Sequence, residues 1–422
     1  MSRIPLLLAL AAGSLAAQPA KWVTTWTASP HGPYPVGNAT VQPNLRFAFP
    51  TPEAGARDQT FRLIVRPDVW GGQARLRFSN VFGTKPLTLD GVFAGTHLGG
   101  GAVLVGTNHA VHFAGKPSIT IAPGESAWSD AVAVAGAPGR KLAVSFHVAG
   151  ESGPMTWHAK ALQTSYLSAP GAGAHGQAED EAAFPFTTTS WYFLDAVDMR
   201  MPAATQLIVA FGDSITDGTA STLNGDDRWP DALSRRLHAK YGDRVAIVNA
   251  GIGGNQVLGP AEYSAAHSFS GGPAARRRID RDVLSLSGVS AIVWLEGIND
   301  TTASADAIAD GMKETIAHVR SQSPGVRVIG ATVLSALGST NGAHGSPAED
   351  EKRRKLNEWI RTSGAFDGVV DFDAPTRDPQ TGSLRPEFVP DSTAGGPGDK
   401  LHPNRAGYLA MAMAVDLALL VK

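Results

Sequence analysis

Residues 206–218 read QLIVAFGDSITDG, and this stretch predicts the fold of the C-terminal half of the chain. The run Leu207 to Phe211 is continuously apolar, which is typical of a strand buried on both faces of a parallel sheet. A Gly-Asp-Ser turn follows the strand directly. In open parallel sheets, sites lie at the carboxyl ends of the strands. The pattern therefore places Ser214 where chemistry is expected.

The rest of residues 204–422 continues as strands that alternate with helices. Further strands are expected at residues 245–249, 291–295, 326–333 and 368–372, and helices at residues 228–241, 274–286, 305–322, 349–363 and 404–420. Pro230 in the first turn and Gly242 after the last turn bound the first of these helices. The pattern predicts an α/β/α domain with a central parallel sheet of about five strands.

Residues 20–203 have a different periodicity. Polar and apolar residues alternate at 60–66, 73–78 and 141–148, and shorter strand-like segments lie at 86–89 and 118–122. Strands with a period of two, separated by Gly, Pro, Asn and Asp turns, indicate antiparallel sheets. We therefore expect a two-domain chain whose first domain is an antiparallel, jelly-roll-like β-sandwich that acts as an accessory domain.

Residues 1–17 have the pattern of a signal peptide. Arg3 precedes the apolar run Ile4–Leu15, and small residues follow at Ala16 and Ala17. The run is shorter than the roughly 20 residues that span a bilayer. We expect export, either to the periplasm or out of the cell, and no membrane span in the mature protein.

Composition argues against several classes of protein. Lys plus Arg is 36 and Asp plus Glu is 38, so the net charge is 36 − 38 = −2, which disfavours a nucleic-acid partner. The chain has no Cys, which excludes a thiol nucleophile, disulfides and Cys-type zinc sites.

Motifs for other chemistries are missing or misplaced. The nearest His pair, His109 and His112, lies in a predicted strand, where residues three apart face opposite sides. There is no His-Glu-x-x-His, and no Gly-x-Ser-x-Gly elbow of the α/β-hydrolases. The glycines at 171, 173 and 176 resemble a dinucleotide fingerprint but follow no strand. We expect no metal and no cofactor.

Four loops carry the residues that indicate chemistry. They are Gly212–Gly218, Asn249–Asn255, Glu296–Asp300 and Asp399–Pro403, and the first three each follow a predicted strand. The first offers a Ser, the second a Gly-rich turn, the third an Asn amide and the fourth a His three residues after an Asp. Each loop is weak evidence by itself, but all four occur in order at one edge of the predicted sheet.

With these four blocks the chain resembles the SGNH, or GDSL-type, serine hydrolase family. The resemblance covers residues 204–422 and implies a flavodoxin-like fold. Within this family the chain is most similar to the exported arylesterase and acylhydrolase-type branch associated with xylan-degrading systems. The residues that carry this similarity include Arg228-Trp229-Pro230 and residues 359–367. The upstream β domain is more loosely similar to one found in exported relatives.

The resemblance implies a role for each block. Ser214 would be the nucleophile, His402 the general base, and Asp399 the acid that orients His402. The oxyanion hole would comprise the backbone N–H groups of Ser214 and Gly254 and the side-chain amide of Asn299. Gly254 is preferred to Gly253 because the family's Gly directly precedes a polar residue.

Other polar residues are expected to be structural. Asp213 and Asp217 are interpreted as a buried hydrogen-bond partner and a turn or cap residue, and Asp300 as a support for the Asn299 loop. The polar loop 335–346 lies at a strand end, so it is expected to alter the substrate rim. The run Arg276–Arg278 is predicted to be a solvated helix face.

The predicted function is a secreted serine esterase that hydrolyses short-chain, acetyl-like esters of carbohydrates or of aryl and alkyl alcohols. The substrate would be a small-molecule or polysaccharide ester. A general carboxylesterase and a glycan-binding protein that acts through the β domain are the alternatives. The glycan-binding alternative depends on six Trp residues of the β domain, which could stack on sugars or instead fill the core and the domain interface. They are Trp22, Trp26, Trp70, Trp128, Trp157 and Trp191.

Overall fold

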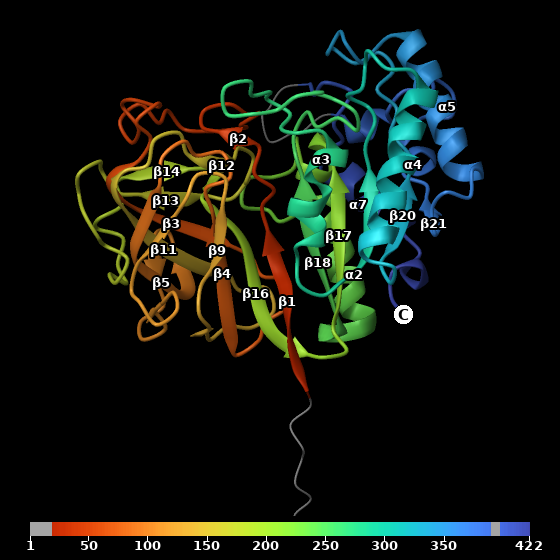
Figure 1. The fold of residues 1–422 in the computed structure, drawn as a ribbon. Helices are drawn as coiled ribbons and strands as arrows, with labels where there is room; N and C mark the ends of the chain where they lie inside the picture. The colour runs from red at the N-terminus through yellow and green to blue at the C-terminus, as the bar shows by residue number, and fades with distance from the viewer. Residues whose placement is uncertain (1–18, 390–396) are drawn as a thin grey trace, which may run out of the picture.

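The computed structural model describes residues 19–389 and 397–422, and two domains lie side by side in it (Figure 1). Strands up to Pro202 form antiparallel sheets, whereas the strands from Gln206 onward form one parallel sheet. The predicted signal peptide, residues 1–17, lies outside the described residues. No helix within the described ranges is long and apolar enough to cross a membrane.

The N-terminal domain contains three antiparallel sheets. The first comprises, in spatial order, β1 (Ala20–Thr27), β16 (Leu194–Pro202), β4 (Gln73–Ser79) and β10 (Val132–Ala133), with β9 (Ser126–Trp128) paired to β4. The second comprises β14 (Phe186–Thr188), β13 (Ser165–Leu167), β3 (Arg57–Val65), β11 (Leu142–Glu151), β5 (Leu87–Gly99) and β6 (Ala102–Val103), with β7 (His109–Ala110) and β8 (Ile119–Ile121) paired to β5. The third comprises β15 (Trp191–Tyr192), β12 (Thr156–His158) and β2 (Gly32–Pro33).

The two large sheets share one apolar core. Phe78 on β4 packs edge-on against Phe146 on β11 at 5.2 Å between ring centroids, and Phe146 stacks on Phe61 of β3 at the same distance. All three rings are fully buried. The domain is therefore rich in antiparallel strands packed in two layers, while the jelly-roll path of the chain stays a prediction.

The six tryptophans of this domain do not form an exposed platform. Trp26, Trp157 and Trp191 are buried, and the other three are only partly exposed. Trp26 packs edge-on against Trp191 at 4.9 Å, and the guanidinium of Arg75 lies over both Trp22 and Trp128. These contacts agree with a role in the core and at the domain interface.

The C-terminal domain contains the predicted five-stranded parallel sheet. Its spatial order is β18 (Val245–Gly251), β17 (Gln206–Gly212), β19 (Val289–Leu295), β20 (Arg327–Ala331) and β21 (Gly368–Val370). In chain order this is 2-1-3-4-5, the flavodoxin-like arrangement. The strands on both sides of β17 follow it in sequence, so the chain reverses its direction of winding there, and the carboxyl end of β17 is the expected position of a site.

Helices cover both faces of this sheet. The described helices are α1 (Ser214–Asp217), α2 (Trp229–Tyr241), α3 (Ala275–Ile279), α4 (Ala305–Gln322), α5 (Pro347–Thr362), α6 (Asp373–Thr376) and α7 (Arg405–Ala414). Short 3-10 turns lie at Gly242–Arg244, Pro386–Phe388 and Leu417–Leu419. The apolar faces of α2 and α7 share one core cluster, and those of α3, α4 and α5 share another, which also includes the core of the β domain.

One helix prediction is wrong in its extent. The helix expected over 404–420 ends at Ala414, because Arg236 of α2 donates to the carbonyls of Ala412 and Val415 and the side chain of Asp416 caps a new turn at Ala418. The helix expected over 274–286 is found at nearly that extent, but its second part, Asp280–Leu284, is π-helical and follows α3 directly.

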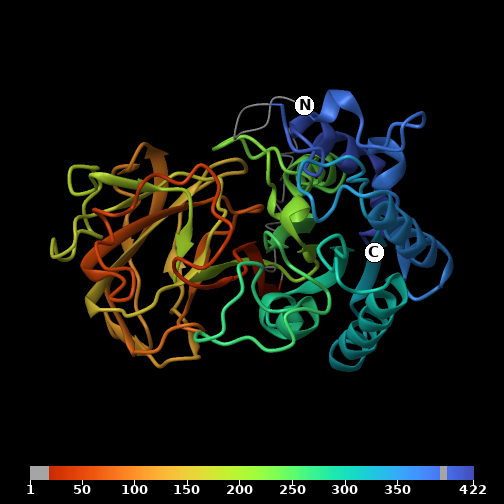
Figure 2. The same ribbon diagram turned by 90° about the horizontal axis from the view of Figure 1, so that it is seen from above.

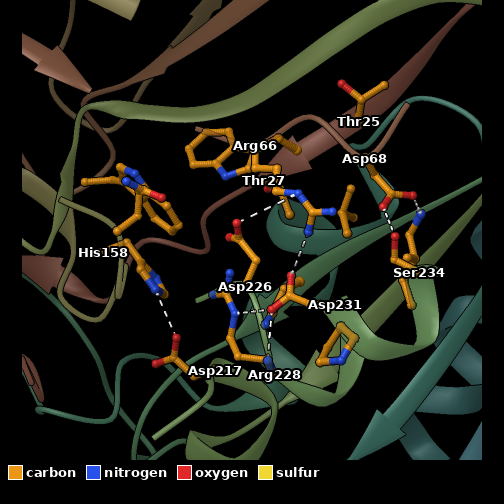
Figure 3. A pocket seen from close by; sticks show the side chains of 17 residues that line it. Thr25, Thr27, Arg66, Asp68, His158, Asp217, Asp226, Arg228, Asp231 and Ser234 are labelled. Atoms are coloured by element: carbon orange, nitrogen blue, oxygen red, sulfur yellow. Dashed lines mark hydrogen bonds and ion pairs between the residues drawn. The ribbon is translucent and has the colours of Figure 1, made fainter. Parts of the chain in front are cut away.

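The domain interface is polar and hydrogen-bonded. Asp68, which follows β3, accepts hydrogen bonds from Ser234 (Figure 3), from His238 Nε2 at 3.0 Å and from the N–H of Ile247 at 2.7 Å. Thr24 on β1 exchanges two hydrogen bonds of 2.9 Å with Ser287, just before β19. These bonds hold the β domain against the edge of the parallel sheet.

We expect His238→Gln to remove a pH-dependent part of the stability. Burial lowers the pKa of His238, but the hydrogen bond and charge of Asp68 and the carbonyl of Gly242 outweigh burial and raise it above its usual 6.5. Because this pKa is raised, the stabilisation that the His238–Asp68 pair adds to the folded protein is complete below about pH 6.5. It is lost as the pH rises through the folded-state pKa. The Tm difference from wild type should be larger at about pH 5.5 than at about pH 8.5. His109→Gln, at an exposed position, is the control, and equal differences at both pH values would contradict the prediction.

Candidate active site

Ser214 lies at the first residue of α1, directly after the carboxyl end of β17. The short helix starts there because Asp213 is its N-cap, with Oδ1 accepting the N–H of Ile215 at 3.0 Å. The Oγ of Ser214 lies 2.8 Å from Nε2 of His402, which lies in the fourth block. Residues 188 positions apart in the sequence thus meet within one hydrogen bond.

Asp399 orients the imidazole of His402. Its Oδ2 lies 2.6 Å from Nδ1 of His402, and its Oδ1 accepts the backbone N–H groups of Leu401 and His402, both at 2.9 Å. Burial alone raises the pKa of Asp399, but the hydrogen bond and charge of His402 and these two N–H donors hold it well below its usual range. Asp399 is therefore ionised, so Nδ1 of His402 carries a proton and Nε2 can accept one from Ser214.

The glycine-rich loop after β18 distinguishes Gly253 from Gly254. The N–H of Gly253 donates to Oδ2 of Asp217 at 2.8 Å, so this donor is already engaged within the fold. Gly254 follows with a φ of +82°, a left-handed conformation that side chains rarely adopt. This geometry favours Gly254, the residue preferred on sequence, as an oxyanion donor.

The amide of Asn299, after β19, faces the same loop. Its Nδ2 donates to the carbonyl of Asn255 at 2.9 Å, and its Oδ1 lies 3.1 Å from Nε2 of His344. Burial, followed by the charge of His402, lowers the pKa of His344, so its ring is neutral and Nε2–H donates to Asn299. Asn299 retains a second N–H on Nδ2 for a ligand.

His344 was missed as a site residue in the sequence analysis. It lies in the polar loop 335–346, whose position at a strand end predicted an altered rim but not a contact with Asn299. A single His in a Gly-rich loop has no spacing signal. Only the folding of this loop across the sheet edge brings it to Asn299.

Asp217 does more than the turn or cap role expected of it. One of its carboxylate oxygens holds the N–H of Gly253, and the other lies 3.1 Å from Nε2 of His158 in the β domain (Figure 3). Both side chains are buried, with 1% and 4% exposure. Asp300 supports its loop as expected, since its carboxylate accepts the N–H groups of Val257 and Leu258 at 2.9 and 3.0 Å.

The prediction of a solvated face at Arg276–Arg278 is wrong for Arg278. Arg276 and Arg277 are exposed, but Arg278 is 1% exposed. Its guanidinium stacks on the ring of Phe211 at 4.0 Å and donates to four groups. These acceptors are the carbonyls of Gly212 and Ala250, the side-chain oxygen of Asn255 and the carboxylate of Asp282, at 2.8, 2.9, 2.6 and 3.1 Å.

Arg278 is buried among acceptors at the ends of β17 and β18. The carbonyl of Gly212 already accepts the N–H of Ile252 at 3.0 Å, and Arg278 gives it a second donor and also donates to the carbonyl of Ala250. A planar guanidinium can serve several acceptors at once.

Within the described residues, no group of three or more His, Asp or Glu side chains is arranged to hold a metal ion, and His109 and His112 are both exposed on the β domain.

We expect Arg278→Lys to destabilise the protein by about 2–4 kcal/mol, because each buried acceptor that loses its donor costs about 1–3 kcal/mol. Lysine keeps the charge but cannot reach four acceptors in one plane. Urea unfolding measures the change, and kcat should fall as well because Gly212 and Asn255 adjoin the site. Arg277→Lys, one position earlier and exposed, is the matched control. Equal stability of the two variants would show that the Arg278 network is dispensable.

Comparison with known proteins agrees with this geometry. Residues 210–410 match a model of the GDSL-like lipase/acylhydrolase family, whereas no curated protein matches the chain. Among solved structures, a carbohydrate acetylesterase family member from Sinorhizobium meliloti is 15% identical with a TM-score of 0.39, covering 51% of this chain and 99% of that one. A putative arylesterase from Agrobacterium tumefaciens is 18% identical with a TM-score of 0.37, covering 50% and 96%. The region that carries the four sequence blocks thus matches the GDSL-like lipase/acylhydrolase family.

Proposed function

We propose that this protein is a serine esterase in which Ser214, His402 and Asp399 act as a catalytic triad. The observation that carries the proposal is a chain of two hydrogen bonds, from Ser214 Oγ to His402 Nε2 at 2.8 Å and from His402 Nδ1 to Asp399 at 2.6 Å. These three side chains lie at the carboxyl edge of the sheet, beside the end of β17, in a region that matches a family of acylhydrolases. A nucleophile, a base and an orienting acid in this order can transfer an acyl group.

The first half of the reaction would form an acyl-enzyme. Ser214 Oγ attacks the carbonyl carbon of the ester while its proton moves to Nε2 of His402. The carbonyl oxygen becomes an oxyanion, which the N–H groups of Ser214 and Gly254 and the amide of Asn299 would stabilise. Collapse of the tetrahedral intermediate breaks the bond to the alcohol, and His402 returns the proton to the leaving oxygen.

The second half would release the acid. Water attacks the acyl carbon, and its proton moves to His402. The second tetrahedral intermediate then collapses with Ser214 as the leaving group, which recovers the proton from His402. The net products are one carboxylic acid and one alcohol, and no cofactor takes part.

We propose short-chain, acetyl-like esters of carbohydrates or aryl alcohols as substrates of an exported enzyme. The resemblance of the sequence blocks supports the acyl and alcohol classes, and the pattern of residues 1–17 supports export. A general carboxylesterase remains the second candidate. A protein that chiefly binds glycans through the β domain is less well supported, because three of the six tryptophans there are buried and the other three are only partly exposed.

We expect Ser214→Ala to lose at least about 10³-fold in kcat on p-nitrophenyl acetate, as is typical when a triad nucleophile is removed. Wild-type activity should fall from acetate to butyrate to octanoate. Acetate should also be released from acetylated xylan by wild type and not by the variant. Tm measured for both proteins checks that the variant is folded.

The outcomes separate the candidates. Preference for octanoate without release of acetate from xylan would favour a general carboxylesterase. Equal activity of wild type and Ser214→Ala would overturn the nucleophile assignment. A folded wild type that is inactive on every ester would overturn the esterase proposal itself.

A further inference from the structure

We propose that Asn38, a residue of the β domain, is a positioning residue that orients the oxyanion-binding N–H of Gly254. The inference rests on the proposed function, because it assigns Asn38 a role through the Gly254 donor. If Asn38 has this role, the β domain contributes directly to the geometry of the active site. Nothing in the residues around Asn38 suggests this role in the sequence.

The contact is direct and crosses the domain boundary. Asn38 lies between β2 and β3, and its Nδ2 donates to the carbonyl oxygen of Gly253 at 2.8 Å. The same Nδ2 lies 3.4 Å from the carbonyl oxygen of Ser270. Both carbonyls belong to the long loop between β18 and α3, which reaches from the parallel sheet toward the β domain (Figures 1 and 2).

The bond acts on the peptide unit that carries the proposed donor. The carbonyl of Gly253 and the N–H of Gly254 belong to one peptide group. A trans peptide is planar, and its C=O and N–H point in opposite directions. A donor that fixes the direction of the Gly253 carbonyl therefore fixes the direction of the Gly254 N–H on the other side. It also polarises the amide, which makes the N–H a stronger donor.

The loop is shaped around this contact. Gly254 has a φ of +82°, and a Cβ built there would lie 2.8 Å from Nδ2 of Asn38. Any side chain at Gly254 would thus oppose both the backbone conformation and the Asn38 amide. The position requires glycine for both reasons.

The β domain also holds, through Asp217, the peptide group between Ile252 and Gly253. The N–H of Gly253 donates to Asp217, whose second oxygen faces Nε2 of His158 on β12. The remaining ring nitrogen of His158 lies 2.8 Å from the carbonyl of Ser29, and Nε2 also lies 3.1 Å from the carbonyl of Lys160. The side chain of His158 thus ties Asp217 to the backbone of the β domain.

Tertiary contacts secure the rest of the loop on the same domain. The hydroxyl of Tyr263 donates to the carbonyl of His31 at 2.5 Å, and its ring packs edge-on against Phe82 at 5.3 Å. The loop is thus fixed at its start by Asn38 and at its middle by Tyr263. The β domain thus adds two contacts to a loop that Asp217, Asp300 and Arg278 hold from the C-terminal domain.

The test compares Asn38→Ala and Asn38→Asp in the full-length protein. Alanine removes the donor, and aspartate keeps the size but places an acceptor against the Gly253 carbonyl. We expect kcat on p-nitrophenyl acetate to fall at least about 10-fold in both variants with KM changed less than about 2-fold, below the 10²–10³-fold cost of losing a whole oxyanion donor. Binding of phenylboronic acid, which forms a tetrahedral adduct on the serine, should weaken in parallel.

Gln42→Ala is the matched control. Gln42 lies four residues further along the same segment and bonds only within the β domain among the contacts described, to Thr188, Thr189 and Tyr192. Its kcat should stay near wild type even if its Tm falls. Asn38 variants that match Gln42→Ala in kcat would overturn the inference, as would a loss that appears in KM alone. If Ser214→Ala keeps full activity, the proposed function fails first, and the two failures are therefore distinguishable.

Discussion

The buried guanidinium of Arg278 is the interaction on which the site depends. The two strands that carry the nucleophile and the glycine-rich loop end side by side. Arg278 satisfies Gly212 at the end of one strand and Ala250 at the end of the other, and it holds the side chain of Asn255 beyond them. One charge thus fixes the spacing of two catalytic loops, and Asp282 balances it.

Two buried acids lie near this cation. Burial raises the pKa of Asp213 to about 7 and that of Glu296 to about 8, against the opposing hydrogen bonds and the charge of Arg278. Trp294 Nε1 donates to Glu296 at 2.7 Å, and the N–H of Ile215 donates to Asp213. Near neutral pH a share of these two carboxyl groups is therefore protonated.

The parallel sheet follows from local patterns, whereas the flavodoxin-like strand order and the roles of Ser214, His402 and Asp399 were expected from the family resemblance. Apolar runs predict the strands, and polar blocks that directly follow the strands predict a site at the carboxyl edge of the sheet. The errors concern residues whose environment is tertiary. Arg278 lies in a run of three arginines that resembles any solvated helix face, and its two neighbours are indeed exposed. His344 and Asn38 lie in loops without periodicity, so no pattern predicts their contacts. The helix expected to reach residue 420 ends at Ala414 because of an arginine on another helix.

The sequence by itself determined the fold class of the C-terminal region and its four chemical blocks, because hydrophobic period and strand-end position are local properties. Tertiary structure alone decided how those blocks are held. The N–H of Gly253 is engaged by Asp217, the carbonyl of Gly253 by Asn38, and Asp217 in turn by His158. Asn38 and Gly253 are 215 residues apart, and His158 and Asp217 are 59 apart. Hydrogen bonds act over about 3 Å in space whatever the separation along the chain, so only the packing of the two domains could bring these partners together.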